Sequence, residues 1–217
     1  LSGVIGWSWP VLLAFAVTPY LLEGLGEEGF GIRSILIMLV GYFSMINFGV
    51  SGAVTKYMSE YVKIDNDYVK DVLLTSFWIH LILGVLGGLA LSLISEYLVN
   101  KLFHISKELE VEAITALRLS AFSFIFTMMN SWAGAVVSGN HRYDILNYTM
   151  SLYGTLTLVG SFILVEAGNG IIGVAVANLI ASICLLIVYV YIFKQLNLFI
   201  NLEIKIKKHV ATRLFKF

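Results

Sequence analysis

Polar side chains recur at helical spacing within an apolar stretch in the first quarter of the sequence. They occupy positions i, i+3, i+7 and i+11, and are Ser44, Asn47, Ser51 and Thr55. At about 100° per residue, these positions fall within one narrow arc of a helix. Polar groups on an apolar helix avoid lipid, so the arc is expected to face protein or water. Hydroxyls and an amide on such a face can hydrogen-bond a polar solute.

A second stripe of this kind follows in a later apolar stretch, and it consists of Ser120, Ser123, Thr127, Asn130, Ser131, Gly134 and Ser138. His80 stands one turn after Ser76 in the stretch between the two. Small and hydroxyl residues also allow membrane helices to pack closely, and Gly84-x-x-x-Gly88 fits that use. Each stripe is therefore either a packing seam or the lining of a cavity. The candidates for a cavity lining are Ser44, Asn47, Ser51, His80, Thr127 and Asn130.

The sequence does not predict catalytic or cofactor chemistry. No group of His, Asp or Glu has the spacing of metal ligands, and Cys184 is the only cysteine. The glycine-rich segment 24–31 lacks the Lys and Ser/Thr of a phosphate-binding loop. We expect neither an enzyme nor a bound cofactor or metal.

Six long apolar stretches must position these polar groups. They are Leu1–Leu22, Ser34–Thr55, Val72–Ser95, Ala113–Val137, Ile145–Val165 and Ile171–Phe193. Hydrophobic residues make up 59% of the chain and charged residues 13%, and the mean hydropathy is +0.87. In lipid, backbone groups must be satisfied within each segment, so such stretches are helices. The sequence predicts an all-α, polytopic membrane protein with six transmembrane helices in residues 1–199, followed by a basic amphipathic connector in 200–217.

The charges are unevenly distributed, although the formal net charge is zero. The basic residues expected on one side are Lys56, Lys63, Lys70, Arg142, Lys194, Lys205, Lys207, Lys208, Arg213 and Lys216. The opposite side has Arg33, Lys101, Lys107 and Arg118. Because loops rich in Lys and Arg stay in the cytoplasm, both termini are predicted to be cytoplasmic. The balanced charge gives no indication of nucleic-acid binding.

The connectors between these stretches are short. Glu23–Arg33 is glycine-rich and acidic, which predicts a tight turn at the outer surface. Glu96–Glu112 mixes apolar and charged residues and is expected to lie along the outer interface. Asn169 and Gly170 predict a minimal turn. Pro10 is expected to kink the first helix.

Several segments resemble bacterial polysaccharide flippases. These are the O-antigen and capsule repeat-unit exporters of the multidrug/oligosaccharidyl-lipid/polysaccharide exporter superfamily. The segments are Thr18–Ile32 (TPYLLEGLGEEGFGI), Ile46–Val50 (INFGV), Lys56–Tyr61 (KYMSEY), Val137–Asp144 (VSGNHRYD) and Arg213–Phe217 (RLFKF). The chain departs from the family pattern at Glu23, where the family usually has a basic residue, and at Asn47, where it often has Asp.

The resemblance implies the N-terminal lobe of a two-lobe transporter in the bacterial inner membrane, whose C-terminal lobe is missing from this sequence. Its expected substrate is a polyprenyl-pyrophosphate-linked oligosaccharide, moved by alternating access. A drug or cation antiporter of the same superfamily is an alternative, although the carboxylates stand at or near the helix ends. A non-transporting membrane scaffold is a second alternative.

The charge asymmetry predicts which loops can be labelled from outside the cell. In a variant lacking Cys184, a cysteine at Glu28 or Glu110 should react with an impermeant thiol reagent. A cysteine at Asn66 or Asn201 should react only after the membrane is opened. The reverse labelling pattern would overturn the predicted orientation.

Overall fold

The computed structural model describes residues 2–45, 47–62, 64–103 and 105–196, together with Val210, Thr212 and Leu214 near the C-terminus. The helices are α1 (Ser2–Met45), α2 (Phe48–Tyr61), α3 (Asn66–Tyr97), α4 (Glu110–Gly139), α5 (Tyr143–Leu164) and α6 (Gly170–Gln195). Single π-helical turns, Leu98–Leu102 and Val165–Asn169, follow α3 and α5. No strand occurs among the described residues. The predicted all-α class is therefore confirmed.

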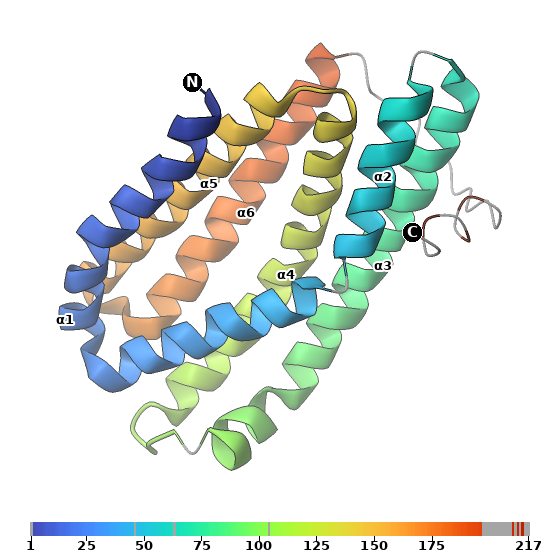
Figure 1. Ribbon diagram of the computed structural model, residues 1–217. Coiled ribbons are helices and arrows are strands. Elements are labelled where there is room, and N and C mark those ends of the chain that lie inside the picture. The colour runs from blue at the N-terminus through green and yellow to red at the C-terminus, as the bar shows by residue number, and fades with distance from the viewer. Residues whose placement is uncertain are drawn as a thin grey trace.

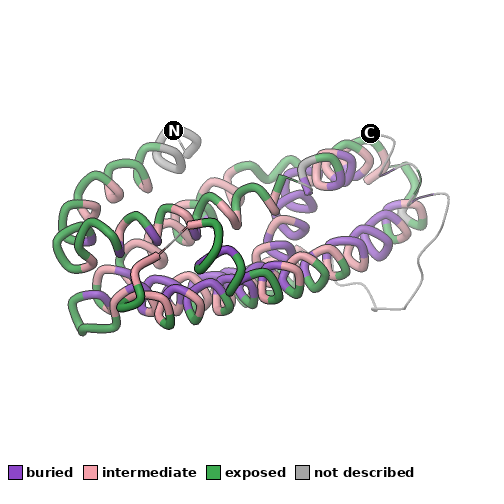
Figure 2. Tube along the Cα trace, turned by 90° about the horizontal axis from the view of Figure 1, so that it is seen from below, coloured by how far each residue is buried: buried purple, intermediate pink, exposed green. Residues whose placement is uncertain are grey.

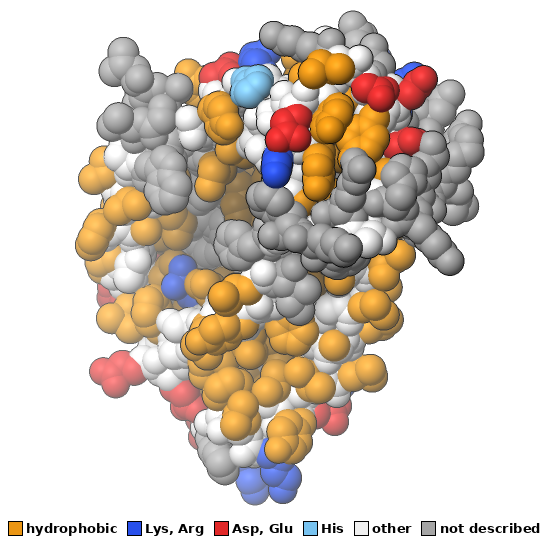
Figure 3. All heavy atoms as spheres, turned by 45° about the vertical axis from the view of Figure 1, so that its right-hand side comes forward, with side chains coloured by type: hydrophobic (Ala, Val, Ile, Leu, Met, Phe, Trp, Pro, Cys, Tyr) orange, Lys and Arg blue, Asp and Glu red, His pale blue; other side chains and the backbone are white. Residues whose placement is uncertain are grey.

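Within the described ranges, four continuous stretches are long and apolar enough to cross a membrane: Ser8–Met45, Asp67–Leu102, Glu110–Gly139 and Tyr143–Gln195. The last of these contains both α5 and α6, which the chain joins by reversing direction. Figure 3 shows hydrophobic side chains over much of the lower half of one face, with charged side chains mainly toward its two ends. This is the surface of a polytopic membrane protein.

Helix α4 lies at the centre of the structure (Figure 1) and contacts each of the other five α-helices. α2 and α3 lie on one side of it, and α5 and α1 lie on the other beyond α6. Buried residues concentrate along the central helices, whereas α1 is mostly exposed or half-buried (Figure 2). Only 6% of the most apolar window of α1 is buried, against 44% for α4. α1 therefore forms an edge of the lobe.

Glycines bring α3 and α4 into close contact. A Cβ atom on Gly88 would lie 2.6 Å from the carbonyl oxygen of Ala121, and one on Gly87 would lie 2.5 Å from the ring of Phe124. Both distances are shorter than any real carbon contact. The predicted packing use of the Gly84-x-x-x-Gly88 motif is thus supported by the geometry.

The chain between the first two predicted spans differs from the predicted turn. Helical dihedrals continue through residues 23–33 except at Gly26, which has φ +69° and ψ 173°. L-residues with a side chain are strained at this φ, so a single glycine makes the reversal. Gly24 allows the bend to approach the π-helical turn after α5, since a Cβ there would lie 2.6 Å from Val165. The predicted eleven-residue turn, Glu23–Arg33, is therefore wrong in extent.

The predicted second helix, 34–55, is also wrong in its bounds. The helical segment that begins after Gly26, residues 27–45, ends at Met45, and α2 begins at Phe48. We call residues 27–45 the oblique segment, because it crosses in front of α4 at a steep angle to α2 (Figure 1). Its Ile32 and Leu36 pack in one apolar cluster with Leu117 of α4. The interruption occurs next to Asn47 and Gly49, two residue types that favour helix ends.

The remaining two connectors of the outer side are the segment 96–112 and the turn before α6. Phe103, Ile105 and Leu109 of the predicted interfacial segment pack against an apolar cluster of the lobe, and Leu102 is exposed. The turn before α6 forms as predicted, with positive φ at Gly168 and Gly170. The side chain of Glu112 accepts a hydrogen bond from the backbone N–H of Ile171 and so caps α6 from α4.

Pro10 does not interrupt α1, because Gly26 is the one position of this helix with non-helical dihedrals. The predicted connector, 200–217, lies almost entirely outside the described residues. Its Val210 and Leu214 are buried in the apolar cluster formed with Val54, Met58 and Val69.

Replacing Gly26 with alanine should destabilise the lobe, because alanine would be forced to a positive φ at a cost of about 1–2 kcal/mol. Gly31→Ala is the matched control, since nothing lies within 4 Å of a Cβ atom built there. It should be neutral or stabilising by about 0.5–1 kcal/mol, because alanine favours the helix. Thermal unfolding in nanodiscs measures both. Equal effects of the two substitutions would contradict the role assigned to Gly26.

Candidate functional site

Three of the six candidate residues meet in one hydrogen-bonded group between α2, α3 and α4. The Nδ2 of Asn47 donates to Ser131 Oγ at 2.6 Å. Ser51 Oγ lies 3.1 Å from His80 Nε2 and 3.4 Å from Ser131 Oγ. His80 Nδ1 lies 2.7 Å from the carbonyl oxygen of Ser76. We call Asn47, Ser51, His80 and Ser131 the His80 cluster.

The His80 cluster continues into neighbouring contacts of the same helices. The indole N–H of Trp132 donates to Ser76 Oγ at 3.0 Å, and the ring of Trp132 packs edge-on to Phe77 at 5.2 Å. Thr55 Oγ1 donates to the carbonyl oxygen of Ala135 at 3.2 Å. The part of the first stripe that lies on α2 therefore faces α4, where its polar groups bind Ser131 of the second stripe and the backbone of Ala135.

Ser44 does not join this cluster. Its hydroxyl donates to the carbonyl oxygen of Val40, one turn back in the oblique segment, at 2.8 Å. The interruption between Met45 and Phe48 separates it from the regular helical arc that the sequence predicted.

The His80 cluster lies near the middle of α3. His80 is 14 residues from Asn66 and 17 from Tyr97 in the sequence, or about 21 and 26 Å along the helix axis at about 1.5 Å per residue. Ser51 contacts His80 at that level, so α2 begins at about half the depth of the lobe. Charged and polar side chains at this depth are costly unless partnered.

The other two candidates lie between α4, α5 and α6. Asn130 Nδ2 donates to the carbonyl oxygen of Ser182 at 2.9 Å, which joins α4 to α6. Thr127 Oγ1 donates to the carbonyl oxygen of Ser123 within α4 at 3.1 Å. The structure thus separates Thr127 and Asn130 from the His80 cluster.

Sequence reasoning missed further polar pairs between α5 and α6. Tyr153 donates to Asn178 Oδ1 at 2.6 Å, and the hydroxyls of Thr149 and Tyr189 lie 3.0 Å apart. A signal for them exists, because Thr149, Tyr153 and Thr157 follow one another at i+4 spacing. Their partners, Asn178 and Tyr189, stand in α6.

Both buried asparagines leave one atom without a partner among the described residues. Asn47 is 3% exposed and Asn130 is 8% exposed, and each uses its amide nitrogen to bind another helix. The Oδ1 of each makes no hydrogen bond. A buried acceptor without a donor is unfavourable by about 1–3 kcal/mol, so each oxygen retains unused hydrogen-bonding capacity inside the lobe.

Arg33 is a cation that the sequence analysis placed in an outer loop. The structure places it in the oblique segment, where it is half-buried and its Nε makes no hydrogen bond within the described chain. The guanidinium lies over the ring of Phe30, 5.4 Å from its centre. Within the described part of the chain, no carboxylate forms an ion pair with Arg33. Its position after the Gly26 bend could not be found from composition.

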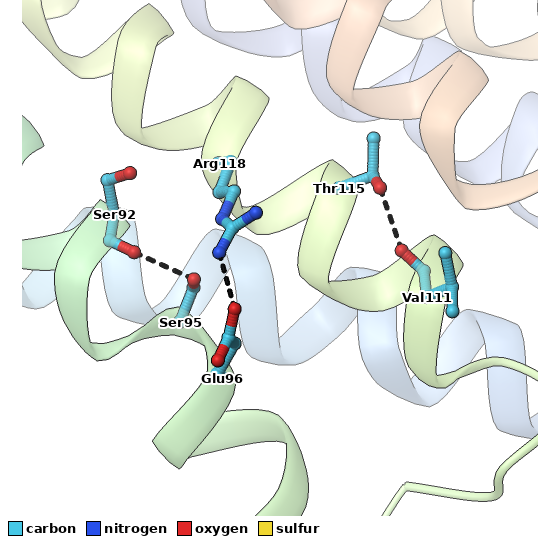
Figure 4. A network of polar contacts seen from close by, with 6 residues as sticks. All are labelled: Ser92, Ser95, Glu96, Val111, Thr115 and Arg118. Carbon is cyan, nitrogen blue, oxygen red and sulfur yellow. Dashed lines mark hydrogen bonds and ion pairs between the residues drawn. The ribbon is translucent and has the colours of Figure 1, made fainter.

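The other described arginines are paired. Figure 4 shows Arg118 extending from α4 toward Glu96 at the end of α3, with 2.6 Å between Arg118 Nη2 and Glu96 Oε1. These two side chains are 52% and 64% exposed, so the pair lies on the surface of the lobe. Arg142 binds Asp144 at 3.0 Å, and this hydrogen-bonded carboxylate raises the pKa of the Arg142 guanidinium. Arg118 is therefore not part of either polar stripe.

Among the residues with described placement, no group of three His, Cys, Asp or Glu is arranged to hold a metal ion.

Comparison with known proteins places the chain in a family. Residues 8–217 match the profile of the polysaccharide biosynthesis protein family. The chain belongs to this family. A family relative from Shigella flexneri, named "Putative O-antigen transporter", is 28% identical over 151 residues, which are 69% of this chain and 35% of that protein. The chain therefore spans about a third of the length of this curated relative.

Solved structures share the fold of this polysaccharide biosynthesis family member. A MOP-superfamily transporter from Pyrococcus furiosus superposes with a TM-score of 0.81 at 18% identity, over 99% of this chain and 48% of that one. An outward-facing multidrug resistance MATE transporter gives 0.78 at 18% identity, over 99% and 49%. An inward-facing multidrug resistance MATE transporter gives 0.76 at 16% identity, over 99% and 51%. The chain has the fold of about half of a MOP-superfamily transporter.

The hydrogen bond between Asn47 and Ser131 should contribute a measurable coupling to stability. An interhelical side-chain bond in a membrane contributes about 0.6 kcal/mol on average. A double-mutant cycle of Asn47→Ala and Ser131→Ala, measured by unfolding in mixed micelles, should give a coupling of about that size. The control pairs Asn47→Ala with Ser138→Ala, whose hydroxyl bonds only within α4. Coupling in the control and none in the test pair would contradict the assigned contact.

Proposed function

We propose that this chain is one lobe of a transporter that flips a polyprenyl-pyrophosphate-linked oligosaccharide across the bacterial cytoplasmic membrane for the synthesis of a cell-surface polysaccharide. The observation that carries the proposal is the match of residues 8–217 to the polysaccharide biosynthesis protein family. The half-transporter fold supports it. The proposed partners are the lipid-linked oligosaccharide, the bilayer and a second lobe.

The physical problem is a large headgroup with many hydroxyls and two phosphates, which cannot cross hydrocarbon unaided. A path for it must replace water with hydrogen-bonding groups at mid-depth. The unpartnered oxygens of Asn47 and Asn130 are acceptors of the required kind. In the proposed mechanism, the two lobes enclose the headgroup, and rocking of one lobe against the other exposes it to each side in turn.

Arg33 is the proposed contact for the pyrophosphate. Its guanidinium is half-buried and has no carboxylate partner in the described chain. A guanidinium binds phosphate oxygens through paired N–H groups, which lysine cannot reproduce. The ring of Phe30 holds one face of the guanidinium and leaves its edge for a ligand.

The test uses the full-length protein in a strain that lacks its own flippase. Arg33→Gln should reduce surface polysaccharide about tenfold or more, since a hydrogen bond to a charged group contributes about 1.5–3 kcal/mol. Arg33→Lys should restore part of the loss because it keeps the charge. Arg118→Gln is the control, because Arg118 pairs with Glu96 on the surface of the lobe.

Protein level in the membrane must stay near normal in all three variants. Normal export by Arg33→Gln together with lost export by Arg118→Gln would reject the assigned roles. A wild-type protein that restores no polysaccharide, yet expels cationic dyes, would favour the drug or cation antiporter instead.

A further inference from the structure

The hydrogen bonds of the His80 cluster have a defined direction. The carbonyl oxygen of Ser76 can only accept, so His80 Nδ1 carries the hydrogen that joins them at 2.7 Å. In a neutral imidazole Nε2 then accepts, and its donor is the hydroxyl of Ser51. Ser51 Oγ accepts from Ser131, and Ser131 Oγ accepts from the amide of Asn47. The chain of donors thus runs from Asn47 through Ser131 and Ser51 to His80.

Protonation of His80 would reverse this direction. One proton from water binds Nε2, which then donates to Ser51 Oγ. The Ser51 hydroxyl turns toward Ser131, and the Ser131 hydroxyl turns toward Asn47. Because the amide N–H₂ cannot accept, a half-turn of the carboxamide brings Oδ1 to Ser131. The oxygen that lacks a partner in the present state gains one, and the N–H₂ group is released. No other group gains or loses a proton.

Among the described residues of the packed helices, no ionised group lies at the level of His80. On α2 the titratable residues begin five residues after Ser51, and are Lys56, Tyr57, Glu60 and Tyr61. On α3 they are Asp67, Tyr68, Lys70 and Asp71 at the start, and Glu96 and Tyr97 at the end. On α4 they are Glu110, Glu112 and Arg118. On α3 and α4 these residues are at least about 13 Å along the axis from the cluster.

The released group would appear where the second span is interrupted. Asn47 immediately precedes α2, and its side chain is buried, with 3% of its surface exposed. In the neutral state Asn47 offers an acceptor, which suits a sugar hydroxyl. In the protonated state it offers N–H donors, which suit a phosphate or carbonyl oxygen.

We propose that His80 is a proton-binding site whose occupancy switches Asn47 between offering an acceptor and offering donors at the start of α2. The switch itself is a property of the His80 cluster. Its effect on transport rests on the proposed function.

The direct test is nuclear magnetic resonance of the full-length protein in nanodiscs, with ¹⁵N-labelled histidine and asparagine. At high pH, His80 should show the Nδ1–H tautomer. As the pH is lowered from about 8 toward the acid limit of the folded protein, it should become doubly protonated, and the Asn47 side-chain amide signals should move with the same midpoint. Ser51→Ala should leave the fold intact and stop the Asn47 signals from following His80. Variants His80→Asn and Asn47→Ala assign the signals.

Two results would overturn the switch: His80 remaining neutral across the whole range, or Asn47 signals that ignore its titration in the wild type. Asn47 signals that still follow His80 in Ser51→Ala would also reject the relay through Ser51.

The transport arm compares the pH dependence of export in His80→Asn with that in His141→Asn. His141 is exposed in the turn after α4 and has φ 59°, a conformation that asparagine tolerates. Wild type and His141→Asn should change export about tenfold across the pH interval in which the His80 signals titrate, whereas His80→Asn should give a flat profile over the same interval. An unchanged profile in His80→Asn would reject the coupling. Absence of export in the wild type would reject the proposed function and leave the resonance test of the switch valid.

Discussion

The contact of α4 with all five other α-helices is the constraint on which the lobe depends. Lipid chains are as apolar as leucine, so burying apolar side chains between membrane helices gives little net driving force. Close approach and interhelical hydrogen bonds must hold the helices instead. The glycines of α3 meet α4 along one side. Ser131 binds α2 on another side, and Asn130 binds α6.

This arrangement resolves the two interpretations of the polar stripes only in part. The stripes of α2 and α4 do bind each other, as packing seams would. Yet packing alone would leave every buried polar atom with a hydrogen-bond partner, and each asparagine retains a buried oxygen without one. The same residues therefore join the helices and leave hydrogen-bonding capacity at mid-depth. Each asparagine can do both because its amide nitrogen makes the interhelical hydrogen bond, while its amide oxygen remains available as an acceptor.

The bounds of α4 to α6 could be predicted closely, because each is an uninterrupted apolar run flanked by charged or turn residues, whereas α3 begins before its apolar run, at Asn66. The same approach failed between residues 23 and 55 for a physical reason. Composition does not distinguish a glycine within helical dihedrals from one at φ +69°, so Gly26 could not be selected from its neighbours. The break before Phe48 lies inside an apolar run and has no composition signal beyond Asn47 and Gly49.

For the site, helical spacing correctly grouped Asn47 and Ser51 on one face, because both lie within α2 or at its edge. It wrongly included Ser44, which lies beyond the break and bonds within its own segment. Spacing along one helix cannot name a partner on another helix, so the contacts with His80 and Ser131 required the fold. Arg33 was misplaced for the same reason as the turn before it.

The oblique segment has a joint at each end: a glycine with positive φ at Gly26, and the interruption between Met45 and Phe48. Its nineteen helical residues make a stiff rod of about 28 Å. A rod of this kind can change its angle as one rigid unit. A tilt of about 10° displaces its far end by about 5 Å without bending any helix, given that length. The first part of α1 and the whole of α2 can then remain packed on the lobe while the rod between them changes its angle. A tilt of the rod would therefore displace the chain at the start of α2 sideways at the level of the His80 cluster.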